Sequence, residues 1–184
     1  ATKAIEQKLN LNIKHGIIWH TQGSGKTALA YYNVRYLKDY YQRQGIIAKF
    51  YFVVDRLDLL TQAADEFRAR GLYVEEVNSK EDFIANIKAT GTSNNTGRDT
   101  ITVLNIQKFY KESIAKASDY NVNVQRIYFL DEAHRSYKPT GSFLSNLMAS
   151  DRNAVMIALT GTPLIGTIYD EVTGMPLKGK GYDY

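Results

Sequence analysis

The chain has 184 residues, 44% of them hydrophobic, and its 23 Lys and Arg against 19 Asp and Glu give a net charge of +4. A chain of this length buries roughly 70% of its extended surface, so one compact domain without stabilising cross-links is expected, and the small positive charge permits a polyanionic partner without requiring one. The absence of cysteine excludes disulfides, Cys-ligated zinc and Cys nucleophiles, and the absence of a run of about 18 apolar residues excludes a membrane-spanning helix.

Short apolar runs alternate with amphipathic segments along the chain. Runs rich in β-branched and aromatic residues predict buried strands, and amphipathic segments free of Gly and Pro predict helices. In chain order we expect strand 13–19, helix 26–41, strand 48–54, helix 58–70, strand 73–77, helix 80–89, strand 101–104, helix 107–117, strand 126–130, helix 143–149 and strand 154–159. This alternation predicts a three-layer α/β/α domain with a mostly parallel central sheet, and the polar segment 90–100 is expected to be a surface loop.

Aromatic residues in the first strand and helix are expected to serve packing. Tyr32, Tyr36 and Tyr40 are four residues apart and therefore share one face of the helix. We expect this face to pack on the sheet rather than to stack on nucleic acid, because the helix must cover the sheet. Trp19, at the end of the first strand, is likewise expected to be a packing residue.

A glycine-rich segment between the first strand and the first helix follows most of the phosphate-loop pattern G-x-x-x-x-G-K-[ST]. Glycines let backbone N–H groups converge on phosphate oxygens, and the helix N-terminus favours their negative charge. His20 replaces the first glycine, which leaves the opening turn of the loop undecided. A strand-to-helix turn with an incidental Lys-Thr pair is the alternative, but the strand before and the helix after favour nucleotide binding. The expected ATP-binding residues are Thr21, Gln22, Gly23, Ser24, Gly25, Lys26 and Thr27.

Within this segment, Lys26 is expected to reach the β- and γ-phosphates and the Thr27 hydroxyl to bind Mg²⁺. Asp131 and Glu132 follow the strand expected over 126–130, and ligands of α/β sheets bind at the carboxyl ends of strands. Asp131 is expected to hold Mg²⁺, directly or through water, and Glu132 to polarise the attacking water. Two acids at a strand end are more often a helix start, but after a phosphate loop they favour an ATPase site.

Five segments in order resemble the motifs of superfamily 2 helicases and translocases. Residues 23–27 resemble motif I, 53–62 motif Ia, 103–109 motif Ib, 131–134 (Asp-Glu-Ala-His, the DEAH box) motif II and 160–163 (Thr-Gly-Thr-Pro) motif III. The resemblance implies a RecA-like P-loop NTPase domain, with 1–163 as the first lobe and 164–184 as a loop leading towards a second lobe. A start without Met and an open end at Tyr184 agree with a piece of a larger protein.

The same resemblance implies roles for residues outside the ATP site. Motifs Ia and Ib contact the DNA backbone in this superfamily, and such contacts give salt-dependent, sequence-tolerant affinity. For any one of these residues, an ordinary polar position at a helix start is an equally good explanation. His134 is expected to couple the ATP site to motif III through Thr160 or Thr162. The expected DNA-binding residues are Arg56, Thr61, Gln62, Asn105, Gln107 and Lys108.

Four segments resemble one family more narrowly, the motor (R) subunit of type I restriction-modification enzymes. They are residues 19–27, 53–59, 131–136 and 159–163. Histidine at the first Walker position is usual in that family, so His20 supports the resemblance. The family implies an ATP-driven translocase of double-stranded DNA, part of a type I site-specific deoxyribonuclease, assembled with methyltransferase and specificity subunits in the bacterial or archaeal cytoplasm.

In that family a nuclease domain precedes the motor, and a second lobe with the arginine finger follows it. Neither is present in this sequence, so the chain alone is expected to bind ATP weakly and to hydrolyse almost none. Two alternatives stay open: another superfamily 2 DNA motor, such as a type III restriction motor or a repair helicase, and a nucleotide switch that does not hydrolyse ATP.

Overall fold

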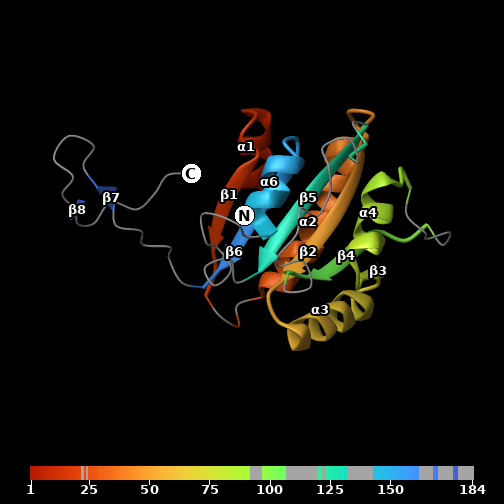
Figure 1. Cartoon of the computed structure of the whole chain (residues 1–184). Helices are drawn as coiled ribbons and strands as arrows, with labels where there is room; N and C mark the ends of the chain where they lie inside the picture. The colour runs from red at the N-terminus through yellow and green to blue at the C-terminus, as the bar shows by residue number, and fades with distance from the viewer. Residues whose placement is uncertain are drawn as a thin grey trace.

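A computed structural model of the chain describes residues 1–21, 23, 25–91, 97–106, 120–121, 123–131, 143–161, 168–169 and 176–177. The elements in chain order are α1 (Thr2–Asn10), β1 (His15–Trp19), α2 (Lys26–Gln42), β2 (Ile47–Val54), α3 (Leu57–Ala69), β3 (Tyr73–Val77), α4 (Lys80–Lys88), β4 (Thr100–Asn105), β5 (Val124–Asp131), α6 (Phe143–Ser150), β6 (Val155–Thr160), β7 (Ile168–Tyr169) and β8 (Pro176–Leu177) (Figure 1). No helix in these ranges is both long and apolar enough to cross a membrane.

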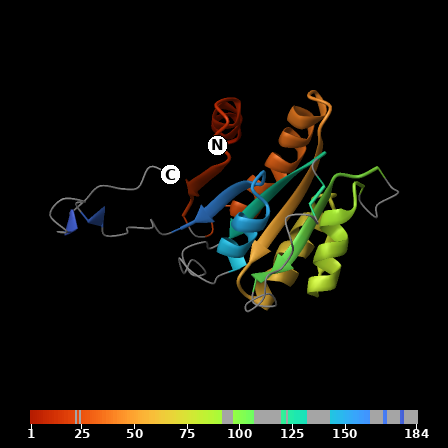
Figure 2. The same ribbon diagram turned by 45° about the horizontal axis from the view of Figure 1, so that its top comes forward.

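Six strands form one parallel sheet in the order β1-β6-β5-β2-β4-β3. Alternate residues of β2 point to opposite faces, so Phe50 and Phe52 join α2 and α3 in one apolar cluster, and Tyr51 joins α4 and α6 in the other. Figures 1 and 2 show these helix layers flanking the sheet. The three-layer α/β/α fold expected from the alternating pattern is therefore confirmed.

Element boundaries agree with the expected ones to within about two residues. Residues 90–91 and 97–99 lie outside helices and strands, as expected for the loop. The helix expected over 107–117 lies outside the described residues. Within 164–184, where a loop is expected, β7 and β8 pair antiparallel. Each has only two residues, too few to produce the alternation that identifies a strand in a sequence.

The expectation that the tyrosine face of α2 packs in the core holds in part, because Tyr36 and Tyr40 are half-buried against the apolar cluster on this face of the sheet and also bond to α1. The apolar side chains of α2 that are buried most completely belong to a neighbouring stripe of Ala30, Val34, Leu37 and Tyr41. The Tyr36 hydroxyl donates to Glu6 Oε2 at 2.5 Å, and the Tyr40 hydroxyl donates to Asn10 Oδ1 at 2.8 Å. Tyr32 is 61% exposed. Both stripes have helical spacing, so periodicity alone did not distinguish them.

A buried ion pair ties β5 to the turn between α6 and β6. The Arg126 and Asp151 side chains are 3% and 1% exposed. The Arg126 guanidinium donates from Nε to Asp151 Oδ2, from Nη2 to Asp151 Oδ1 at 3.0 Å and from Nη1 to the Asn121 carbonyl at 2.9 Å. Burial alone would lower the pKa of Arg126, but the hydrogen bonds and charge of Asp151 raise it. The pair therefore stays charged and fixes β5 beside β6.

We expect Asp151→Ala to lower the free energy of unfolding by about 3–5 kcal/mol, because Arg126 would keep a buried charge without its carboxylate partner. Urea unfolding followed by circular dichroism measures the change. The control is Glu76→Ala, which removes the surface pair between Arg68 Nη2 and Glu76 Oε1 at 2.5 Å and should cost at most about 1 kcal/mol. Equally small losses in the two variants would contradict the role of the buried pair.

Candidate active site at the carboxyl edge of the sheet

The sheet topology gathers the expected motifs at one edge. β6 lies between β1 and β5, with Trp19 opposite Thr160 and Asp131 opposite Leu159 in the two registers. Because the three strands are parallel, their carboxyl ends meet on the same side, where α/β sheets bind ligands. The loop after β1, the acid at the end of β5 and the threonine at the end of β6 therefore face a common space.

The loop expected to bind phosphate has glycines where the backbone requires them. Gly23 has φ +76° and Gly25 has φ +90°, both in the left-handed region that other residues rarely adopt. Gly25 is the N-cap of α2, and its carbonyl accepts a hydrogen bond from Leu29 N at 2.9 Å. The first turn of α2 contains no acidic residue. Its N-terminal N–H groups can therefore receive an anion without competition from a carboxylate.

Lys26 and Asp131 form an ion pair between two motifs far apart in sequence. Lys26 Nζ lies 3.3 Å from Asp131 Oδ1, and the two side chains are 10% and 16% exposed. Partial burial strengthens the attraction between the charges relative to one in water. Both groups of this pair could also take new partners. The carboxylate is a ligand suited to Mg²⁺, and the ammonium is suited to bind phosphate oxygens.

At this edge of the sheet, the described residues that could bind a metal ion suit Mg²⁺. They contain no cluster of three or more His, Cys, Asp or Glu side chains that could hold a metal ion by themselves. Mg²⁺ bound with nucleotides commonly takes one or two protein ligands and completes its shell with phosphate oxygens and water. Thr27 in the first turn of α2 and Asp131 at the end of β5 are a fitting pair for that role.

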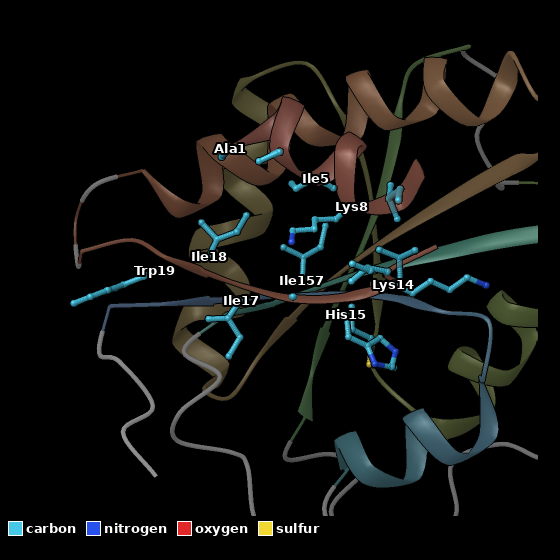
Figure 3. Close-up of a pocket in the computed structure, with 15 residues that line it drawn as sticks. Ala1, Ile5, Lys8, Lys14, His15, Ile17, Ile18, Trp19 and Ile157 are labelled. Carbon is cyan, nitrogen blue, oxygen red and sulfur yellow. The ribbon is translucent and has the colours of Figure 1, made fainter. Parts of the chain in front are cut away.

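Trp19 connects the phosphate-loop strand to motif III, which the sequence did not indicate. Its indole Nε1 donates to the Gly161 carbonyl at 3.2 Å, and His20 N donates to the Thr160 carbonyl at 2.8 Å. Trp19 is 65% exposed, so the expectation that it serves packing is wrong. It lies at the end of an edge strand, and Figure 3 shows its ring extending away from the sheet.

The expected DNA-binding residues differ in their access to solvent. Arg56 is exposed and forms a two-bond pair with Asp58, from Nε to Oδ1 at 3.1 Å and from Nη2 to Oδ2 at 2.8 Å. Gln62 is exposed on α3, whereas Asn105 is 1% exposed at the end of β4. Arg56 and Gln62 are therefore accessible to a polyanion. Asp55, just before Arg56, has a buried Oδ1 that accepts no hydrogen bond from any described residue.

Seven of the expected site residues cannot be placed in this geometry. They lie outside the described residues and are Gln22, Ser24, Gln107, Lys108, Glu132, His134 and Thr162. The structure places the other expected ATP-site and coupling residues at the same edge of the sheet. They lie in the loop between β1 and α2, in the first turn of α2, and at the ends of β5 and β6, and are Thr21, Gly23, Gly25, Lys26, Thr27, Asp131 and Thr160.

Comparison with known proteins identifies the family of the chain. The model of the SWI2/SNF2 ATPase family matches residues 1–174. The chain is 29% identical over 167 residues to the type I restriction enzyme SsaAORF53P endonuclease subunit of Staphylococcus saprophyticus, covering 89% of this chain and 16% of that protein. It is 32% identical over 153 residues to the putative type I restriction enzyme MjaIXP endonuclease subunit of Methanocaldococcus jannaschii, covering 81% of this chain and 13% of that protein.

Among solved structures, the chain resembles a nuclease-deletion mutant of the Type ISP restriction-modification enzyme LlaGI in complex with a DNA substrate mimic. The TM-score is 0.53 and the sequence identity 13%, covering 91% of this chain and 17% of that chain. At this identity the similarity supports the fold alone. The chain spans less than a fifth of the length of each of these three proteins.

We expect Gly25→Ala to lower the free energy of unfolding by about 1–2 kcal/mol, because a Cβ disfavours the left-handed backbone at this position. The added Cβ would meet only Ala28 Cβ at 3.6 Å, so the cost comes from the backbone rather than from a clash. Gly16→Ala on β1 is the control, since nothing lies within 4 Å of its added Cβ and its effect should stay within about 0.5 kcal/mol. Urea unfolding that gave equal losses for both variants would contradict this interpretation.

Proposed function

The chain belongs to the SWI2/SNF2 ATPase family, and from this premise we propose that it is the first lobe of an ATP-driven motor that moves along double-stranded DNA. The observation that carries the proposal is the ion pair between Lys26 and Asp131, because it joins the phosphate loop to the acidic motif. Similarity to type I restriction endonuclease subunits of a bacterium and an archaeon supports the motor of a type I R subunit over a type III motor or a repair helicase.

In this proposal residues 1–163 form the lobe that binds ATP. Backbone N–H groups of the phosphate loop and of the first turn of α2 would bind the phosphates. The Lys26 ammonium, paired with Asp131 in the structure, would instead contact the β- and γ-phosphate oxygens. Thr27 and Asp131 would hold Mg²⁺, which when bound neutralises charge on the phosphates. Glu132 orients and deprotonates the attacking water. The arginine that completes the site would come from a second lobe, to which residues 164–184 lead.

Motion along DNA requires a second surface and a link from the ATP site to it. Arg56 and Gln62 are accessible at the start of and within α3, and we assign them backbone contacts together with Gln107 and Lys108. Asn105, expected from the sequence to join them, is 1% exposed and too buried to contact DNA. Contacts to phosphates carry no sequence information, which suits a motor. The link would run from His134 to Thr160 or Thr162. The bond from Trp19 to Gly161 supports this route, since it joins the phosphate-loop strand to motif III.

The partners that follow from this function are double-stranded DNA and the methyltransferase and specificity subunits of a type I restriction complex. Recognition of a DNA sequence would belong to the specificity subunit, so this lobe needs only sequence-tolerant contacts. Because the similar restriction subunits come from a bacterium and an archaeon, we propose the cytoplasm of such a cell as the location.

We expect Lys26→Ala to weaken binding of a fluorescent ATP analogue by the 184-residue chain roughly 10- to 100-fold, because a charge-assisted bond to phosphate contributes about 1.5–3 kcal/mol. Titration in the presence of Mg²⁺, followed by fluorescence anisotropy, measures the dissociation constant. Lys3→Ala, on the exposed face of α1, is the control and should bind as the unaltered chain does. Undiminished binding by the folded Lys26 variant would contradict a phosphate role for this lysine.

In a longer form of the protein that also carries the second lobe, we expect Glu132→Gln to lower DNA-stimulated ATP hydrolysis about 10²- to 10⁴-fold. ATP binding should persist, because the amide keeps the shape of the carboxylate but cannot accept the proton of water. Release of inorganic phosphate with and without duplex DNA measures the turnover. Unchanged turnover would show that Glu132 does not activate the attacking water.

The 184-residue chain provides the matching test of the two-lobe site. It should bind ATP without appreciable turnover, and rapid DNA-stimulated hydrolysis by this chain alone would refute the need for a second lobe. A nucleotide switch would show no DNA-stimulated hydrolysis even in the longer, unaltered protein.

A further inference from the structure

The outer side of β1 is an open strand edge. β1 has β6 on one side and is the last strand of the sheet. Met156 N donates to the Lys14 carbonyl at 2.8 Å, and His20 N donates to the Thr160 carbonyl at 2.8 Å. The even-numbered backbone groups of this stretch therefore face β6. Because backbone groups alternate in direction along a parallel strand, those of the odd-numbered residues face outward.

These outward groups are the N–H and C=O of His15, Ile17 and Trp19. No backbone group in the described part of the chain pairs with them. An edge of this kind is a template on which another extended segment can form hydrogen bonds. The strand offers three donors and three acceptors in a row.

The two edges of the sheet differ in chemistry. The opposite edge strand, β3, carries Glu75 and Glu76, and Glu76 is paired with Arg68. Charged side chains on an edge strand oppose the addition of a further strand. β1 is apolar apart from His15, and its Ile17 and Trp19 side chains are 38% and 65% exposed. Only the β1 edge therefore combines outward backbone groups with an uncovered apolar surface among the described strands of the sheet.

An apolar cavity of about 500 Å³ lies beside this edge, between α1, β1 and β6 (Figure 3). Ile5 and Leu9 of α1, Ile18 of β1 and Ile157 of β6 contribute to its lining. Ile17 points to the other face of the strand in the same view. Alternate side chains of an added segment would therefore enter the cavity on one face and cover Ile17 and Trp19 on the other.

Charge around the cavity indicates the chemistry of the occupant. Lys8 and Lys14 are in the lining, which contains no acidic residue. Lys8 is exposed near the end of α1, and Lys14 directly precedes β1. Both are therefore near the amino end of the strand. A segment with carboxylates at the corresponding end would complement them.

We propose that the free edge of β1 binds an extended segment of a partner protein, as an added strand of the sheet. Its main chain pairs with His15, Ile17 and Trp19, its alternating apolar side chains fill the cavity and cover Ile17, and acidic residues at one end face Lys8 and Lys14. This mode of recognition takes its affinity from main-chain hydrogen bonds and its specificity from the side chains on either face.

Three synthetic peptides test the proposal on the full 184-residue chain. The first alternates valine and threonine and has two glutamates at one end, the second has lysines in place of the glutamates, and the third is the first with its alternate amides N-methylated. Trp19 is the only tryptophan of the chain and is largely exposed, so its emission reports when the edge is covered. We expect the first peptide to shift this emission to the blue, to bind about 10-fold more tightly than the second, and to lose binding on N-methylation.

A variant of the strand gives a second, independent readout. Ile17→Pro removes an N–H that points outward and leaves the hydrogen bonds between β1 and β6 in place, since proline is tolerated on the open side of an edge strand. We expect at least a 10-fold loss of binding of the first peptide, measured by anisotropy, with the unfolding midpoint unchanged. Ile17→Val keeps the N–H and should bind as the unaltered chain does. If the proline variant has a lower unfolding midpoint, the comparison of the three peptides on the unaltered chain tests the proposal by itself.

Several outcomes would overturn the proposal. They are no change in Trp19 emission with the first peptide, equal binding of the glutamate and lysine peptides, and equal binding of the N-methylated peptide. Concentration-dependent association of the chain in analytical ultracentrifugation, abolished by Ile17→Pro, would also overturn it, because the edge would then take a second copy of the chain.

Discussion

The ion pair between Lys26 and Asp131 is the interaction on which the interpretation of this domain depends. It exists because β1 and β5 both lie beside β6 and run in the same direction, which brings a lysine at a helix start and an aspartate at a strand end to 3.3 Å. The two side chains are largely buried, so each charge is balanced mainly by protein groups rather than by water. In the proposed function, a Mg²⁺–nucleotide would supply a replacement partner for each of them.

The pair depends on supports elsewhere in the sheet. At the opposite end of β5, Arg126 is bound to Asp151, which directly follows α6 and holds β5 in register with β6. On the other side of β6, Trp19 and His20 bond to the Gly161 and Thr160 carbonyls. The first contact thus links β5 to β6 near their amino ends, and the second links β1 to β6 at their carboxyl ends.

The strand that ends in the phosphate loop is also the open edge of the sheet, and this relates the two proposals. Binding of an extended segment along β1 would add hydrogen bonds to the outward groups of His15, Ile17 and Trp19. These residues directly precede the loop and the bond to Gly161. A partner on this edge would therefore stiffen the support of the ATP site without occupying it, whereas the charged β3 edge offers no equivalent position.

The amino-acid sequence by itself determined the alternating strands and helices of the α/β fold, because these depend on local spacing, and it predicted the phosphate loop and the acidic motif from the same kind of local pattern. It did not determine the role of Trp19 or of the α2 tyrosines. A tryptophan after an apolar strand has the same local pattern whether a neighbouring strand covers it or not, and Tyr36 and Tyr40 share their spacing with the stripe that is buried most completely. The strand order, with β1 at the edge of the sheet, decided that Trp19 is exposed. The position of α1 decided that Tyr36 and Tyr40 bond to that helix. Both are long-range arrangements, and so is the approach of Lys26 to Asp131, because only the packed sheet brings distant residues together.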